Sequence, residues 1–192
     1  MNWYKKILTS DYESDNIFEN SQIDMKRNIM KYIITKKAQQ SKEFILLRGI
    51  SGSGKSTLSK QLAGGSGQIF SADDFFMDEQ GNYNWVGNKL PTAHKWNHDR
   101  IKEAIEQGIS PVVMDNTNIT MWDMGQAKYL VQFAQEKGYQ VKIEQTNTPW
   151  AFDAKELAKK NTHGLNEQRI QKQIDRWVPD VSVNDILNYN KD

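Results

Sequence analysis

The sequence predicts an α/β fold in which a parallel β-sheet carries helices on both faces and a helical extension precedes it. Three observations predict this fold. Apolar, strand-like runs alternate with helix-like segments after residue 40, which is the pattern of a parallel sheet. A glycine-rich phosphate-binding pattern joins the first of these strands to a helix. Polar clusters follow the first three strands, at the sheet edge where such folds bind ligands.

Residues 1–40 are predicted to form a separate helical extension. From Ile23 onward, apolar residues recur at helical spacing with basic residues around them, which indicates a helix over about 23–39. The apolar stripe of this helix consists of Ile29, Met30, Ile33 and Ile34. We expect the stripe to pack on the domain that follows. A role at a membrane surface is the alternative for such a basic amphipathic stretch.

Residues 41–192 are predicted to form one domain. The expected strands cover about 44–49, 68–71, 111–114 and 139–145, and the expected helices cover about 55–63, 93–107, 120–137, 150–160 and 166–177. Gly108 and Gly138 stand where two of these helices should end, because glycine favours the position after a helix. Residues 77–92 are expected to form a long loop.

The run GISGSGKST at 49–57, called the phosphate loop below, is a complete G-x-x-x-x-G-K-[ST] pattern. Its glycines let backbone N–H groups close around phosphate oxygens, and the next helix adds partial positive charge at its N-terminus. Lys55 is expected to reach the β- and γ-phosphates of a nucleotide, and the Ser56 hydroxyl to bind Mg²⁺. The candidate nucleotide contacts are Gly49, Ser51, Gly52, Ser53, Gly54, Lys55, Ser56 and Thr57. A glycine-rich turn without a ligand is the alternative.

Two further polar clusters follow the second and third strands. They are Asp73-Asp74 and Asp115-Asn116-Thr117-Asn118. Because the carboxyl ends of parallel strands meet at one edge of a sheet, both clusters should lie beside the phosphate loop and form an active site with it. Taken alone, each cluster is also typical of a helix cap or an Asx-type turn.

The composition is that of an ordinary globular protein. The 192 residues are 38% hydrophobic and 26% charged, with a net charge of +1 and no cysteine, which excludes a disulfide framework and a thiolate metal site. Neither a long apolar run nor an N-terminal signal core is present, so we expect a cytoplasmic protein without a membrane partner. Residues 155–176 hold six basic and three acidic residues, an excess that fits phosphate contacts or a solvated helix face equally well.

Five segments together resemble a known family. They are RGISGSGKST at 48–57, SADDFF at 71–76, LPTAHKWN at 90–97, VMDNTNITMW at 113–122 and ELAKKNTHG at 156–164. In order and spacing they resemble the P-loop kinase domain of the Nedd-four-binding-protein-two-like family, over about residues 44–177. That family is related to phage-type 5′-hydroxyl polynucleotide kinases. The resemblance therefore implies a P-loop NTPase fold of the adenylate-kinase-like kind.

The resemblance also implies an activity, which is Mg²⁺-dependent transfer of the γ-phosphoryl group of ATP to a hydroxyl, foremost the 5′-hydroxyl of a nucleic acid. In the related kinases the aspartate at the position of Asp73 activates the acceptor hydroxyl. Asp74 is the alternative, and it could instead cap the next segment or bind Mg²⁺ through water. Asp115 is implied to hold Mg²⁺ together with Ser56, although some related kinases place the acid at the position of Asn116.

One segment departs from the family pattern. The family usually has an arginine directly before the asparagine, and this chain has Lys160 before Asn161. The resemblance implies that Lys160 takes the lid role on the ATP phosphates. A lysine keeps the charge of an arginine but lacks its bidentate fork. Arg169 or Arg176 could therefore share this role.

The histidines and aromatic residues suggest less. His94 is expected to pack near the acceptor site or to cap its helix, and His98 to lie at the surface. Together with His163 they show no metal-ligand spacing. Tyr83 and Trp85, in the long loop, are the best candidates for stacking on an acceptor. The other tryptophans of the domain, Trp96, Trp122, Trp150 and Trp177, are expected in the core.

Two other functions remain open at this stage. The first is a small-molecule kinase on the same fold, acting on a nucleoside, sugar or antibiotic, which the near-zero net charge favours. The second is a nucleotide-binding regulatory module with little turnover that uses residues 1–40 to bind a partner. The intact Lys55, Ser56 and Asp73 argue against the second.

Overall fold

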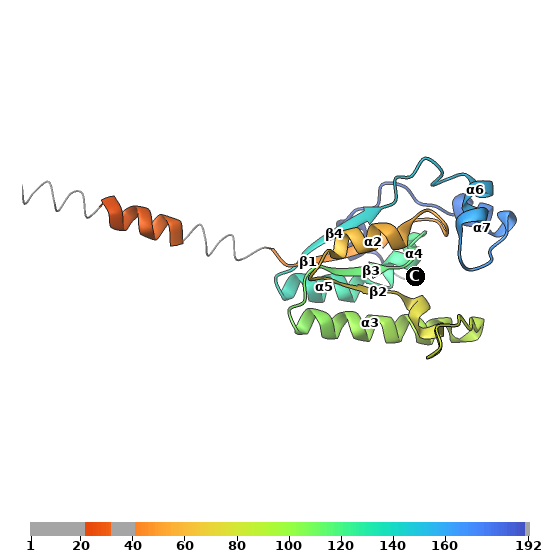
Figure 1. Ribbon diagram of the computed structural model, residues 1–192, viewed down its shortest axis with the longest axis horizontal. Helices are drawn as coiled ribbons and strands as arrows, with labels where there is room; N and C mark the ends of the chain where they lie inside the picture. The colour runs from red at the N-terminus through yellow and green to blue at the C-terminus, as the bar shows by residue number, and fades with distance from the viewer. Residues whose placement is uncertain (1–21, 32–40, 191–192) are drawn as a thin grey trace, which may run out of the picture. The chain divides into compact units, whose positions relative to one another are not determined.

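The computed structural model describes residues 22–31 and 41–190 of the 192-residue chain (Figure 1). Contacts divide the chain into two units, residues 1–40 and residues 41–192. That these units are domains with roles of their own stays a prediction. Within the described ranges, no helix is both long enough and apolar enough to cross a membrane.

The described part of the first unit is an α-helix over residues 22–31, with every residue exposed. Its apolar side chains, Ile23, Met25, Ile29 and Met30, are between 47% and 66% exposed. The remainder of the predicted helix, with Ile33 and Ile34, lies outside the described residues. A helix this short is marginal by itself in water. Burial of its apolar stripe against another surface therefore stays a prediction.

The second unit contains a parallel sheet, as predicted. Its strands are β1 (Glu43–Arg48), β2 (Gln68–Phe70), β3 (Val112–Asp115) and β4 (Gln140–Gln145), in the order β2-β3-β1-β4. All three neighbouring pairs are parallel, and Leu47 of β1 lies opposite Asp115 of β3. The carboxyl ends of β1, β2 and β3 therefore share one edge. That edge positions the polar clusters of the sequence.

Helices cover both faces of this sheet, which confirms the predicted fold class. The α-helices are α2 (Lys55–Ala63), α3 (Leu90–Glu106), α4 (Met121–Gly125), α5 (Lys128–Glu136), α6 (Ala154–Lys160), α7 (Glu167–Asp175) and α8 (Val183–Asn188), and the 3₁₀ helices are η1 (Ala72–Phe76) and η2 (Gly87–Lys89). Figure 1 shows α2 on one face and α3 and α5 on the other. Accordingly, Ile45 and Leu47 of β1 pack with Ala63 of α2, and the alternate residues Phe44 and Leu46 pack with α3 and α5.

One predicted helix, over 120–137, is two helices in the structure. The first, α4, ends at Gly125, where an added Cβ would overlap the ring of Tyr189. Tyr189 follows α8, a helix that the sequence pattern did not reveal, and Ile186 of α8 is buried in the main core. Because this contact joins distant parts of the chain, helical spacing alone could not show where α4 ends.

Two other helices begin at different residues than predicted. Helix α3 begins at Leu90 rather than near residue 93, with Pro91 in its first turn, where the missing N–H of proline costs no hydrogen bond. Helix α6 begins at Ala154 rather than near residue 150, because the Asp153 side chain caps it by accepting the Glu156 N–H at 3.0 Å.

Two predictions about single side chains are wrong. His98 does not lie at the surface, because it faces α5, where its ring centroid lies 5.6 Å from that of Tyr129, and it is only 5% exposed. Trp122 does not lie in the core. The short helix α4 buries only Met124, and Trp122 in its first turn is exposed.

Candidate active site

The phosphate loop connects β1 to α2, and its backbone is shaped to hold an anion. Gly52 and Gly54 adopt positive φ angles of 85° and 95°, which glycine tolerates best. Within the described part of the chain, the N–H groups of Gly52, Gly54, Lys55 and Ser56 have no protein hydrogen-bond partner. Unpaired N–H groups at a helix N-terminus are a ready-made phosphate site. The loop therefore fits the β-phosphate of a nucleotide.

Lys55 lies at the centre of a small charge cluster. Its Nζ donates to the Ile50 carbonyl at 3.2 Å, which keeps the side chain folded over the loop. Burial lowers the pKa of the Lys55 ammonium, and the carboxylates of Asp115 and Asp73 oppose this shift. The structure thus brings Lys55 within electrostatic reach of both candidate acids.

Residues after β4 form hydrogen bonds with the phosphate loop, and no sequence pattern pointed to these contacts. The Thr146 hydroxyl donates to Ser53 Oγ at 2.8 Å, and the Thr148 hydroxyl donates to the Ser53 carbonyl at 3.2 Å. The Trp150 indole N–H donates to the Gly52 carbonyl at 3.3 Å. The Lys160 ammonium lies 4.5 Å from the centre of the Trp150 ring. Lys160 is therefore placed one side chain away from the loop.

Helix α7 also contacts the phosphate loop. The Ser51 N–H donates to Oε1 of Gln173 at 3.0 Å. Arg169 and Arg176 stand four residues before and three residues after Gln173, and residues at these spacings share one side of a helix. Both arginines are exposed. Arg169 therefore lies on the side of α7 that contacts the loop, and Arg176 directly follows the helix.

Asp115 ends β3 at the same edge. Burial raises the pKa of the Asp115 carboxyl, while a hydrogen bond with Ser59 and the charge of Lys55 oppose the shift. The side chain of the neighbouring Asn116 contacts η1 instead, because its Oδ1 accepts the Ala72 N–H at 3.1 Å. Among the described residues, no three His, Cys, Asp or Glu side chains gather as metal ligands. A hydroxyl such as that of Ser56 and one carboxylate still suit Mg²⁺, which keeps several water and phosphate ligands.

The next two residues of this cluster have structural contacts. The Gly49 N–H donates to the Thr117 carbonyl at 3.0 Å. The buried Asn118 side chain donates through Nδ2 to the Leu47 carbonyl at 2.8 Å. Both residues therefore connect the end of β3 to the end of β1, next to the phosphate loop.

Asp73 and Asp74 lie in η1, and their surroundings differ. The Asp74 carboxylate has two partners at Oδ2. It accepts the Ser71 N–H at 3.4 Å as part of a capping box, and it forms an ion pair with Arg100 at 3.2 Å. Asp73 is 52% exposed, and its Oδ1 accepts a hydrogen bond from the Tyr83 hydroxyl at 3.1 Å. The two carboxylates are thus similarly exposed, with 48% for Asp74, and they differ in their partners and in their interaction with Lys55, which only Asp73 influences.

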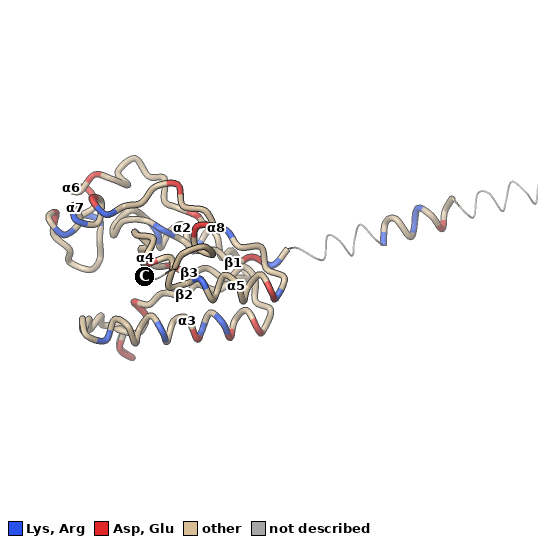
Figure 2. Tube along the Cα trace, turned by 180° about the vertical axis from the view of Figure 1, so that it is seen from behind, with Lys and Arg blue, Asp and Glu red and all other residues tan. Residues whose placement is uncertain are grey.

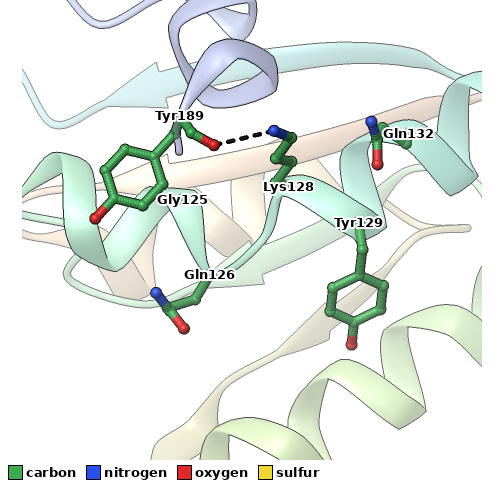
Figure 3. A pocket seen from close by; sticks show the side chains of 6 residues that line it. All are labelled: Gly125, Gln126, Lys128, Tyr129, Gln132 and Tyr189. Carbon is green, nitrogen blue, oxygen red and sulfur yellow. Dashed lines mark hydrogen bonds between the residues drawn. The ribbon is translucent and has the colours of Figure 1, made fainter. Parts of the chain in front are cut away.

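Two cavities lie apart from this cluster. One of about 290 Å³ lies between α5 and the C-terminal segment, and Figure 3 shows the Lys128 ammonium bonded to the Tyr189 carbonyl there, at 3.0 Å. The other, of about 600 Å³, is lined by residues 166–168 and Gln171 of α7. Neither is lined by a residue of the phosphate loop.

Comparison with known proteins agrees with this geometry. The AAA domain family matches residues 44–179. Human NEDD4-binding protein 2 is 40% identical over 146 residues, which is 75% of this chain and 8% of that protein. This chain thus spans less than a tenth of that relative. The resemblance to a P-loop kinase domain of the NEDD4-binding protein 2 type is confirmed.

A solved structure supports the fold. The structure of the Pnkp1/Rnl/Hen1 RNA repair complex contains a chain that superimposes with a TM-score of 0.54 at 17% identity, covering 73% of this chain and 46% of that one. At this identity the similarity concerns the fold alone. With the matched family, the phosphate loop and the parallel sheet taken together, this chain belongs to the AAA domain family and contains its P-loop kinase-like fold.

Proposed function

We propose that this chain is an ATP-dependent, Mg²⁺-requiring kinase that transfers the γ-phosphoryl group to the 5′-hydroxyl of a nucleic acid. One observation carries the proposal. The phosphate loop after β1, Asp73 in η1 after β2, and Asp115 at the end of β3 lie at the same edge of the parallel sheet, where both acids act on the charge of Lys55. A phosphate-binding lysine, a carboxylate for Mg²⁺ and an accessible carboxylate are the parts that phosphoryl transfer to a hydroxyl requires.

The phosphate loop has the role of binding ATP. Its unpaired N–H groups and Lys55 hold the β- and γ-phosphates, and Ser56 and Asp115 would hold Mg²⁺. When bound, Mg²⁺ neutralises charge that develops on the phosphates. Lys160 and Arg169 flank the loop through Trp150 and α7, where they can contact phosphate oxygens.

Asp73 has the role of general base. It accepts the proton of the acceptor hydroxyl as the acceptor oxygen bonds to the γ-phosphorus and the bond to the bridging oxygen of ADP breaks. Asp74 is less suited to this role, because it is paired with Arg100 and, unlike Asp73, is not one of the two carboxylates that act on Lys55.

Three observations support a nucleic acid as the acceptor. The solved structure with the similar fold is that of an RNA repair complex. The basic excess lies within residues 155–176, which include α6 and α7, and Figure 2 shows basic as well as acidic residues along these helices. Trp85 is 58% exposed two residues after Tyr83, and exposed aromatic rings stack on nucleobases. A small-molecule alcohol is the second candidate acceptor, which the net charge of +1 favours.

The experiment is transfer from [γ-³²P]ATP to a panel of 5′-hydroxyl DNA, 5′-hydroxyl RNA and small alcohols. We expect labelled oligonucleotides and no labelling by Lys55→Ala. Asp73→Asn should lower the rate on the order of 10²-fold or more, as loss of a general base does, and Asp74→Asn should lower it much less. The KM for the oligonucleotide should rise with salt, since a few phosphate contacts release counterions.

Several results would contradict the proposal. Full activity of Lys55→Ala would remove the role of the phosphate loop. A larger rate loss in Asp74→Asn than in Asp73→Asn would exchange the roles of the two acids. Labelling of small alcohols alone would make the chain a small-molecule kinase.

A further inference from the structure

The Asp73 carboxylate is contacted from two segments that are far apart in the sequence. The Tyr83 hydroxyl donates to Oδ1 at 3.1 Å, and His163 Nε2 lies 3.7 Å from Oδ2. The rings of Tyr83 and His163 also contact each other, with centroids 5.0 Å apart. One carboxylate and two rings thus form a closed set of three contacts.

His163 stands at the tip of a turn between α6 and α7 that is fixed by one side chain. Asn161 Nδ2 donates to the carbonyls of Ala158, at 2.7 Å, and Leu165, at 2.9 Å, while its Oδ1 accepts the Leu165 N–H at 2.8 Å. Gly164 turns the chain with a φ of 66°. Because the base of the turn is closed by Asn161, His163 is held in position before any ligand binds.

Tyr83 is held on the opposite side. It pairs with Met77 in a β-bridge, and its ring lies 6.1 Å from that of Phe76, which is buried. Burial, with Asp73 beside it, raises the pKa of the Tyr83 hydroxyl. Tyr83 therefore stays protonated and acts as a donor to Asp73.

The segment that carries His163 is also fixed to the phosphate loop and to the residue before it. Within this α6–α7 segment (residues 150–177), Trp150 donates to the Gly52 carbonyl and Gln173 accepts from the Ser51 N–H. The Arg48 guanidinium, next to the loop, stacks on the Trp177 ring at 3.9 Å. The same segment thus contacts the loop that binds ATP and the proposed base.

We infer that His163, together with Tyr83, is a positioning residue that holds Asp73 in register with the phosphate loop. The inference rests on the proposed function, since it concerns the base of that reaction. Half of the Asp73 side chain faces solvent, so without these contacts its carboxylate could rotate away from the acceptor hydroxyl. Phosphoryl transfer depends on in-line placement of the attacking oxygen and is sensitive to displacements of about 1 Å.

If His163 had a merely structural role, its variants would lose stability together with activity. The His163–Asp73 contact is partly exposed, with side-chain exposures of 35% and 52%, and exposed contacts of this kind contribute little to stability. Variants of His163 should therefore fold and melt like the unchanged protein. Any loss of rate then reports on the position of Asp73.

The first test compares His163→Ala, His163→Gln and Thr162→Ala in transfer from [γ-³²P]ATP to a 5′-hydroxyl oligonucleotide. We expect His163→Ala to lower kcat on the order of 10- to 100-fold, with the KM for ATP within about twofold. His163→Gln keeps an N–H donor and should recover part of the rate. Thr162→Ala, an exposed neighbour in the same turn, should have the unchanged kcat. Tyr83→Phe, which keeps the ring but loses the hydroxyl, should resemble His163→Ala.

The second test is a double-mutant cycle. If His163 acts through Asp73, then His163→Ala should lower the residual rate of Asp73→Asn no further, because coupled residues are not additive. If the double variant lost rate by the product of the two single losses, or if His163→Ala had an unchanged kcat, the inference would be overturned while the proposed function stands. If the unchanged protein labels no acceptor of the panel, the proposed function fails first and this inference with it.

Discussion

At the scale of single residues, burial changes what an ionisable side chain can do. His98 of α3 is 5% exposed, and its Nε2 is buried without a hydrogen-bond partner among the described residues. Burial first, and then the nearby His94, lowers the pKa of the His98 imidazole to about 4, while Asp99 opposes the shift. His98 is therefore neutral in the folded protein at neutral pH.

This shift predicts a pH dependence of stability. The pKa of His98 is about 4 when folded and near 6.5 when unfolded, so the unfolded chain binds more protons between these values. Stability should therefore be fully present above about pH 6.5 and fall by up to roughly 3 kcal/mol as the pH approaches 4. Urea unfolding at a series of pH values measures this slope.

The control is His98→Gln, which carries no charge at any pH. Its stability should change less steeply between pH 6.5 and 4 than that of the unchanged protein, whatever its absolute value. Equal slopes in the unchanged protein and His98→Gln would show that the pKa of His98 is the same in the folded and unfolded states.

At the scale of elements, the sequence predicted those features that depend on a few consecutive residues. The phosphate loop and the strand ends that carry Asp73 and Asp115 are short motifs, so the sequence showed them and the structure places them at one edge of the sheet. Gln173 and Thr146 contact the loop from more than 90 residues away, and no spacing links them to it. The end of α4 at Gly125 was missed for the same reason.

The close approach of α6 to the phosphate loop leads to a second prediction. A Cβ on Gly52 would overlap the Leu157 carbonyl of α6, whereas a Cβ on Gly64 would meet no atom within 4 Å. Both glycines have positive φ, so alanine strains the backbone at either position, by about 1–3 kcal/mol. Only in Gly52→Ala must α6 also move away from the loop, because of the overlap with the Leu157 carbonyl.

We expect Gly64→Ala to lose about 1–3 kcal/mol of stability and to bind ATP normally. Gly52→Ala should be less stable than that and should bind ATP at least about tenfold more weakly, because its loop can no longer keep the anion-binding shape. Thermal unfolding and titration with a fluorescent ATP analogue measure the two quantities. Equal ATP affinity in the two variants would argue against any role of the α6 contact in shaping the loop.

At the scale of the whole molecule, the candidate site is confined to the second unit. The phosphate loop, both acids and the α6–α7 segment all lie within residues 41–190. The first unit contributes a described helix over residues 22–31 whose apolar side chains are about half exposed or more. Four such side chains would each contribute roughly 1.5–3 kcal/mol if fully buried. We therefore expect the extension to contribute to stability or to a partner surface rather than to ATP binding.

Deletion of residues 1–40 tests this division of roles. We expect the shortened protein to have a lower melting temperature or lower solubility, because the helix of the extension is too short to persist without a surface to cover it. The active fraction should keep its KM for ATP, since every candidate phosphate contact lies at Gly49 or beyond. A matched variant, Ile29→Ser with Met30→Ser in the full chain, should reproduce the loss of stability if the apolar stripe is its cause. An unchanged melting temperature with a raised KM for the oligonucleotide would show instead that the extension belongs to the acceptor site.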